Sequence, residues 1–361
     1  MMLTTWLQSI GAGDGLTALG IRALAAAVAA LVLSLVIGRY LIRGFRRARV
    51  TEDVAQPDSQ RLDEMRRCKK GTPTMGGLMI IGAMLVAVAV FAHVTSFCVL
   101  LACGAMLALA ALGFTDDYLK LRRGSAEVGR LLTRKVKLAV EFALGLGIAA
   151  LILWHTRENA DLWGRLAMPF TSGGLYLGWA YGLVAAFVIA GMTNAVNLTD
   201  GLDGLAGGCS LATAFVLAVI ACSLSAPTAQ GAFIPGAEEL TVVCAALVGA
   251  LLGFLWYNRH PARIFMGNVG ALAVGGLLSV SVVALRQEAL SLLFAAVFVI
   301  EALSVALQVG WFKLTRKRIF LCAPFHHHLE FAGWPETKVT SRLWMLSAVS
   351  GGLALVLFRC G

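Results

Sequence analysis

Two adjacent carboxylates, Asp116 and Asp117, follow directly on an apolar stretch of the chain. Acids this close repel each other, and the pKa of one rises unless a cation or a proton is shared between them. One acid would suffice to cap a helix, so the pair favours a magnesium-phosphate site or a proton-transfer site. Lys120 and Lys135 follow in the same polar segment, where they either face a diphosphate or only fix the orientation of the chain in a membrane.

A second candidate site lies between residues 194 and 208, which read NAVNLTDGLDGLAGG and include no Lys or Arg. Two acids and two amides close to a membrane are costly unless they bind something, so the segment predicts a ligand site. Its Asp and Gly spacing resembles a calcium loop only superficially, because the terminal bidentate Glu is missing.

Three further segments carry groups suited to anions. Residues 69–77 read KKGTPTMGG, whose ammonium, hydroxyl and backbone amide groups suit a phosphate; a basic anchor before a helix is the alternative. Residues 323–328 read APFHHH, and these histidines either bind a metal or phosphate, exchange protons, or form a solvated loop. Asn268, within 258–270, is an amide that needs a ligand or an interhelical hydrogen bond.

The composition indicates which elements must position these groups. Of 361 residues, 59% are hydrophobic and 14% charged, which excludes ordinary soluble enzymes, disordered chains and disulfide-rich secreted modules. Apolar runs long enough for a ~30 Å hydrocarbon core predict an all-α polytopic integral membrane protein, a single membrane domain over 1–361 with ten transmembrane helices. The runs are 21–42, 74–94, 97–115, 137–154, 175–193, 205–225, 240–257, 264–285, 289–312 and 343–358.

The distribution of charge predicts the orientation. Twenty-four of the 30 Lys and Arg residues fall in 43–73, 116–137, 258–264 and 313–342. By the positive-inside rule these loops are cytoplasmic, so both termini lie outside and the active-site cleft faces the cytoplasm. The basic excess thus fits a lipid bilayer, and we expect no nucleic-acid partner because no basic, aromatic-interleaved module is present. Residues 1–17 contain no Lys or Arg, so we expect no cleavable signal.

Taken in order, KKGTPTMGG, DDYLK, NLTDGLDGL and APFHHH resemble the motifs of the phospho-N-acetylmuramoyl-pentapeptide transferases, in the polyprenyl-phosphate N-acetylhexosamine-1-phosphate transferase superfamily. The resemblance covers about residues 69–344. It implies a magnesium-dependent homodimer of the bacterial inner membrane that joins UDP-N-acetylmuramoyl-pentapeptide to undecaprenyl phosphate, giving lipid I and UMP. The triple histidine with GWPE favours this branch over the sister enzymes that use UDP-N-acetylglucosamine.

The same resemblance implies roles for individual residues. The catalytic centre would contain Asp116, Asp117, His326 and His327. The substrate-binding residues would be Lys69, Thr74, Lys120 and Lys135 around the diphosphate, and Asn197, Asp200, Gly201, Leu202 and Asp203 on the nucleoside side, with Asn258 and Phe265 near the uracil.

One departure concerns the metal. The family reads Asp where this chain has Asn268, so of the expected Mg²⁺ ligands Asp117 is present and the other is a neutral amide. An amide oxygen can ligate but brings no charge to a hard dication, so we predict weakened magnesium binding and low activity. The alternatives are an inactive family member or scaffold, and a polytopic transporter. A transporter is disfavoured because the polar motifs cluster on one face and no repeat is visible.

Overall fold

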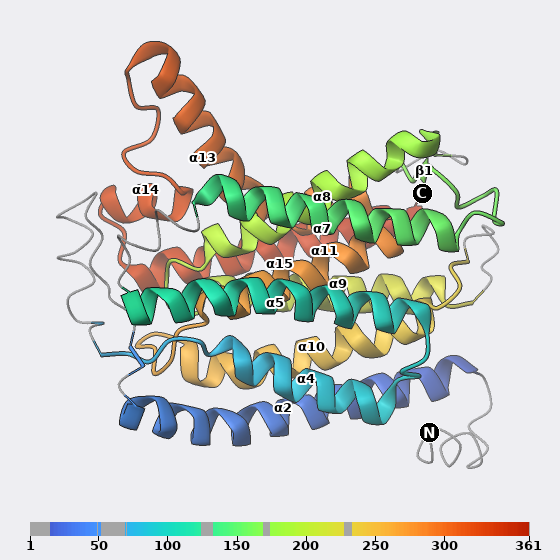
Figure 1. Ribbon diagram of the computed structural model, residues 1–361, viewed down its shortest axis with the longest axis horizontal. Coiled ribbons are helices and arrows are strands. Elements are labelled where there is room, and N and C mark those ends of the chain that lie inside the picture. Colours follow the sequence, from blue (N-terminus) through green and yellow to red (C-terminus); the bar gives the residue numbers. More distant parts are fainter. Residues whose placement is uncertain are drawn as a thin grey trace.

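The computed structural model describes residues 15–48, 50–51, 69, 71–123, 133–168, 174–226 and 233–360. Long helices run side by side along the longest axis of the molecule (Figure 1), as the apolar runs predict. The helices of the described residues are α2 (Gly15–Ala48), α4 (Gly77–Phe91), α5 (Phe97–Arg123), α7 (Arg134–His155), α8 (Tyr181–Thr199), α9 (Leu205–Leu224), α10 (Ala237–Asn258), α11 (Gly267–Ala284), α12 (Glu288–Phe294), α13 (Ala296–Thr315), α14 (Phe325–Phe331) and α15 (Glu336–Cys360), with a 3-10 turn, η2 (Gly178–Ala180).

The expected all-α polytopic architecture is confirmed. Nine helices of the described chain are long and apolar enough to cross a membrane. The predicted run 74–94 appears as α4, an apolar helix of 15 residues that falls short of that length. The predicted run 289–312 is divided into α12 and α13 at Ala295, and α13 leans out of the bundle before the chain returns to α14 (Figure 1).

Two short strands form the only β-hairpin of the described residues. β1 (Arg165–Leu166) pairs antiparallel with β2 (Leu175–Tyr176) between α7 and α8. The predicted run 175–193 therefore begins too early, because its first two residues are strand and α8 itself begins at Tyr181.

Helix α11 is the centre of the bundle. It consists largely of Gly, Ala, Val, Leu and Ser, and 83% of the residues in its apolar stretch are buried inside the bundle. Small side chains let neighbouring backbones approach closely. A Cβ on Gly77 of α4 would lie 2.0 Å from the Cα of Gly270 on α11, so the two helices touch backbone to backbone where the candidate site begins.

Several predicted boundaries fall short of the true helix ends. α5 continues eight residues past the predicted end at 115, so Asp116, Asp117 and Lys120 lie on the helix. α8 continues to Thr199, which places Asn197 on its last turn. These polar residues can extend a helix because they bond to neighbouring helices, whereas a hydropathy window registers only their polarity.

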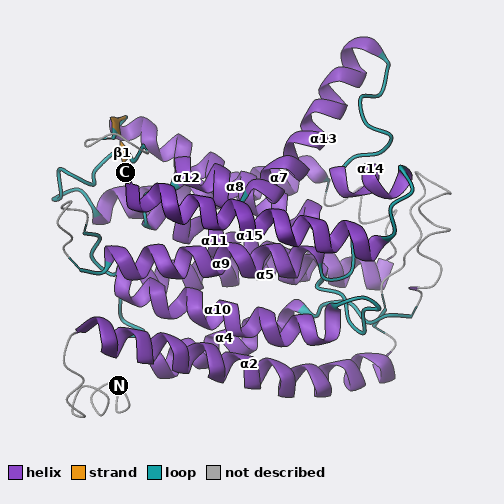
Figure 2. Ribbon diagram, turned by 180° about the vertical axis from the view of Figure 1, so that it is seen from behind, coloured by secondary structure: helices purple, strands orange, loops and turns teal. Residues whose placement is uncertain are grey.

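The two ends of the bundle differ. Helix α14 marks one end, which we call the α14 end, and the β1–β2 hairpin marks the other, the hairpin end (Figure 2). The first residue of α2 and the last of α15 both lie at the hairpin end (Figure 1), as expected if the termini share one side of the membrane.

Candidate functional site

The acidic pair of α5 is buried at the α14 end, with Asp116 1% and Asp117 7% exposed. Lys120, one turn further along α5, places its Nζ 2.9 Å from the Asp116 carboxylate. Lys137 of α7 places its Nζ 2.5 Å from the same group, and the Asn268 amide of α11 donates to it. Three helices thus converge on the Asp116 carboxylate through long or polar side chains.

Asp117 faces the start of α11. Its Oδ2 accepts a hydrogen bond of 3.0 Å from the backbone N–H of Val269. Gly267 has φ +72°, and a Cβ there would lie 2.8 Å from Asp117 Oδ2 and 3.0 Å from the Thr74 hydroxyl. Only glycine suits this turn. Because Gly267 has no side chain, the Asp117 carboxylate, the Thr74 hydroxyl and the first turn of α11 can come together.

The donor set around Asp116 suits a hard dication. Mg²⁺ takes one or two carboxylates, keeps several waters and uses substrate phosphates for the remaining positions. Asp116, Asp117 and Asn268 offer two carboxylates and one amide oxygen from the adjoining ends of α5 and α11. The residues present therefore fit magnesium, with less negative charge than three carboxylates would supply.

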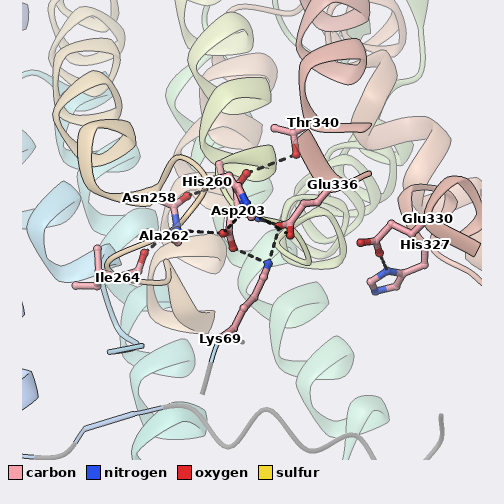
Figure 3. A network of polar contacts seen from close by, with 11 residues as sticks. Lys69, Asp203, Asn258, His260, Ala262, Ile264, His327, Glu330, Glu336 and Thr340 are labelled. Carbon is pink, nitrogen blue, oxygen red and sulfur yellow. Dashed lines mark hydrogen bonds and ion pairs between the residues drawn. The ribbon is translucent and has the colours of Figure 1, made fainter. Parts of the chain in front are cut away.

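A second polar cluster surrounds Asp203, which lies between α8 and α9 (Figure 3). Its carboxylate receives Lys69 Nζ at 2.7 Å, His260 Nδ1 at 3.1 Å and the backbone N–H of Ala262 at 3.0 Å. Glu336, the first residue of α15, accepts from the Asp203 backbone N–H at 2.7 Å and lies 2.6 Å from Lys69 Nζ. The cluster joins four segments that are far apart in the sequence.

Lys69 occupies the position that a cation would take in this cluster. Among the described residues, Asp203, His260 and Glu336 form the one group of three His, Cys, Asp or Glu side chains whose ligand atoms are close enough together to hold a metal. Both carboxylates already contact the Lys69 ammonium. Burial lowers the pKa of Lys69, but Glu336 and Asp203 outweigh that effect, and the pKa is raised above 10.5. The lysine therefore stays charged and neutralises the pair.

Asn258, the last residue of α10, braces this cluster. Its side chain accepts from the Gly204 N–H at 3.0 Å and donates to the Ile264 carbonyl at 2.8 Å. Beyond it, Phe265 exchanges backbone hydrogen bonds with Pro73 and Gly76. The segment 258–268 therefore runs from the Asp203 cluster to Asn268, alongside the chain that leads from Lys69 to Thr74.

The histidines come from the short helix α14, where His326 and His327 are buried. The solvated-loop alternative is thereby excluded for these two. His326 Nδ1 lies 3.0 Å from Glu301 of α13, which also accepts from the His326 backbone N–H. A proton on Nδ1 leaves Nε2 as an acceptor. Nε2 has no hydrogen-bond partner and faces Gly201, where a Cβ would lie only 2.4 Å away. His327 Nδ1 bonds to Glu330 at 2.7 Å.

The three groups adjoin one another along the chain. Thr74 is five positions after Lys69 and Asp203 is two positions after Gly201, spans of at most about 18 Å and 7 Å. Within the candidate set, Asn197 and Asp200 are half-buried beside them and Leu202 is buried. Lys135 stays apart: it is exposed on α7, and Lys137, one half-turn on, contacts Asp116 instead.

Four residues of the site were not among the sequence candidates: Lys137, His260, Glu301 and Glu336. Glu336 belongs to the GWPE segment, and His260 belongs to the segment 258–270. Both segments stood out in the sequence, but neither residue had an expected role. Lys137 and Glu301 fall within or at the edge of apolar runs. Glu301 of α13 contacts His326 and so fixes the orientation of a histidine of α14.

Comparisons with known proteins found one family model, one family signature and several relatives that match this chain. The family model described as glycosyl transferase family 4 matches residues 97–286, and phospho-N-acetylmuramoyl-pentapeptide-transferase signature 1 matches residues 69–81. The chain is 40% identical over 341 residues to the phospho-N-acetylmuramoyl-pentapeptide-transferase of Methylacidiphilum infernorum (isolate V4), with 92% of each chain covered. It is 40% identical over 340 residues to that of Syntrophus aciditrophicus (strain SB), again with 92% of each covered, and 39% over 350 residues to that of Desulfotalea psychrophila, with 94% and 93% covered.

Proposed function

Because the chain belongs to the family of phospho-N-acetylmuramoyl-pentapeptide transferases, we propose that it transfers phospho-N-acetylmuramoyl-pentapeptide from UDP-N-acetylmuramoyl-pentapeptide to undecaprenyl phosphate. The products are lipid I and UMP. The observation that carries the proposal is the buried Asp116–Asp117 pair, which meets two lysines and the first turn of α11 at one end of the bundle.

In this reaction an oxygen of the lipid phosphate forms a bond to the phosphorus attached to the sugar, and the bond from that phosphorus to UMP breaks. Positioning and neutralisation of charge dominate such phosphoryl transfers. Asp116 and Asp117 form the centre of the site. Lys120 and Lys137 contact Asp116 in the free protein and turn toward the diphosphate, whose charge they neutralise, when the substrate binds. Lys135 lies at the margin of the site, and the Thr74 hydroxyl lies beside Asp117.

The nucleoside end of the substrate fits the neighbouring cluster. Lys69 and Asp203, braced by Asn258, form a fixed polar wall, and Asn197, Asp200, Gly201 and Leu202 continue it. Phe265 supplies an aromatic ring near the uracil. His326 and His327 line the same cleft, and the unpartnered Nε2 of His326 is an acceptor for a substrate hydroxyl or a proton.

Magnesium would be held by Asp117 and Asp116 with the amide oxygen of Asn268. When bound, it neutralises the charge that collects on the diphosphate. The amide at 268 donates to Asp116, where an aspartate would repel it. In this chain two lysines neutralise the Asp116 carboxylate, and the uncharged amide of Asn268 only donates a hydrogen bond to it.

The membrane context completes the proposal. The α14 end faces the cytoplasm of a bacterial inner membrane, because the loops there carry most of the cations. Helix α4, together with residues 74–76, makes the tenth span. Both termini lie outside, and the protein works as a homodimer.

The test is magnesium-dependent release of UMP from UDP-N-acetylmuramoyl-pentapeptide by the purified chain, with and without undecaprenyl phosphate, beside the variant Asn268→Asp. We expect acceptor-dependent release that increases at least about tenfold in the variant, since a third carboxylate strengthens the cation site. Without acceptor-dependent release in either protein, the proposed reaction is wrong. Equal release in both proteins would overturn only the role given to Asn268.

Asn268 also favours a second candidate, a family member that binds substrate without turning it over. Calorimetric binding of UDP-N-acetylmuramoyl-pentapeptide by the chain, with no UMP release until Asn268→Asp is introduced, is the outcome that supports it.

A further inference from the structure

The hairpin end contains a pocket, largely apolar but with a few polar groups, that the proposed reaction does not use. Its volume is about 80 Å³, and it lies between the start of α5, the end of α7 and the end of α11. Its polar lining is His155, Thr156, Asn159 and Arg286, against an apolar wall that includes Ile152. Since the acidic pair lies at the opposite ends of α5, α7 and α11, the pocket is a membrane thickness away from the candidate active site.

Arg286 is the charged group of this pocket. It is 5% exposed and follows the last turn of α11. Its Nη2 donates to the Thr156 hydroxyl at 3.4 Å, and its guanidinium carbon lies 4.2 Å from the centre of the Tyr181 ring. Its Nη1 has no hydrogen-bond partner. In the described part of the chain no carboxylate forms an ion pair with it.

The acid Glu288 lies close enough to attract the Arg286 guanidinium but forms no ion pair with it. Glu288, two residues further on, is buried, and one of its oxygens receives the hydroxyl proton of Tyr181. A buried guanidinium without a paired anion is costly, so such a group normally marks a binding site or bound water. A volume of about 80 Å³ exceeds the share of one water, about 30 Å³. The pocket therefore accommodates an ion with several oxygen atoms.

The remaining lining is arranged for such an ion. The His155 ring stacks on Phe97 with centroids 3.8 Å apart and 10° between planes, which fixes the imidazole at the wall. Asn159 is exposed at the rim, where its side chain accepts from the backbone N–H of Asp161 at 3.1 Å and leaves its amide N–H₂ for a ligand. Guanidinium, imidazole and amide donors suit a tetrahedral oxyanion.

We propose that this pocket binds a phosphate group, with Arg286 as its principal contact and His155 and Asn159 as further donors; Thr156 holds Arg286 in place. The phosphate comes either from a phospholipid headgroup or from free inorganic phosphate, because the pocket lies where spanning helices leave the membrane. The site is distinct from the one that handles the substrate diphosphate.

The experiment measures the melting temperature of the purified full-length protein in detergent. Inorganic phosphate is compared with chloride at equal ionic strength, and a short-chain phosphatidylglycerol is compared with the matching diacylglycerol. We expect a rise of at least about 3 °C with one phosphate-bearing probe. The rise disappears in Arg286→Gln and persists in Arg157→Gln, an exposed arginine at the same end that stacks on Trp154.

The outcomes separate the sources. A rise only with the lipid identifies a headgroup, and a rise only with inorganic phosphate identifies the free ion. No rise with either probe, or an equal rise in the wild type and Arg286→Gln, overturns the proposal. UMP release by Arg286→Gln should equal that of the wild type, so failure here is distinguishable from failure of the proposed reaction.

A second variant covers the case in which Arg286→Gln does not fold. Asn159→Asp has the same shape, keeps the bond from Asp161 and adds a negative charge at the rim. We expect it to weaken the apparent phosphate affinity at least about tenfold, equivalent to 1.4 kcal/mol. Affinity equal to that of the wild type would overturn the proposal on its own.

Discussion

Asp116 and Asp203 are both buried carboxylates at the α14 end, yet the groups that hold them differ. Asp203 is fixed by the backbone N–H of Ala262, and its own backbone N–H is fixed by Glu336. Within the part of the chain that the structure describes, Asp116 is held only by side chains, of which Lys120 is 39% exposed. Backbone donors belong to the fold, whereas lysine side chains can turn toward another anion. The Asp203 cluster is therefore a fixed wall, and the Asp116 cluster can exchange partners.

The same substitution at a lysine of each cluster tests this difference. Lys69→Met leaves the Asp203 and Glu336 carboxylates facing each other without a cation, and we expect a loss of about 3 kcal/mol in stability. Lys120→Met should cost less than about 1 kcal/mol, because this lysine is partly exposed and Lys137 still contacts Asp116. Thermal unfolding of both variants measures the difference; equal losses would contradict the distinction.

Asp116→Asn should reduce activity strongly and stability only a little. It removes a charge from the centre of the exchangeable cluster, so we expect UMP release to fall by about 10²-fold, as when one electrostatic group of an active site is lost. The melting temperature should change little, since Asn keeps the shape. The assay is best made in the Asn268→Asp background, with Asp161→Asn, an exposed acid of the hairpin end, as control. Release within about threefold of that background would remove Asp116 from the reaction.

Sequence reasoning identified the membrane fold and most of the residues around both clusters. Hydropathy alone located the spans, because a bilayer requires long apolar helices. Hydropathy placed the end of α5 at residue 115, because it does not register that Lys137 of another helix neutralises Asp116. Lys135 was chosen over Lys137 for the same reason: two positions on a helix point about 200° apart, and only packing against α5 decides which side chain faces the acid.

The Asp203 wall was harder to predict. Asp203 itself stood out in a segment without Lys or Arg, but its contacts come from Lys69, His260 and Glu336, which are more than 50 residues away in the chain. Such pairing depends on the crossing of α10, α15 and the segment before α4. No local periodicity encodes it.

Backbone packing around Asn268 offers a smaller test. Gly113 of α5 lies against α11, and a Cβ there would be 2.3 Å from the carbonyl oxygen of Asn268. Gly113→Ala should therefore separate the two helices, cost about 1–3 kcal/mol and reduce UMP release about tenfold or more. Gly104→Ala on the same helix meets no atom within 4 Å and is the matched control, with unchanged activity. Equal activity in both variants would show that the approach of α5 to α11 does not set the geometry.

The smallest expected effect is a pH dependence confined to the Asp203 wall. Burial opposes the charge on Lys69, but Glu336 and Asp203 raise its pKa above 10.5. The folded-state pKa is thus higher than the unfolded one, about 10.4. The stabilisation is then complete below the unfolded value and is lost as the pH rises through the folded value. From about pH 10 to about pH 12, the melting temperature of the wild type should fall more steeply than that of Lys69→Met. Lys120→Met should follow the wild type, because its lysine belongs to the cluster that exchanges partners; parallel curves for all three proteins would show that Lys69 carries no special share of the stability.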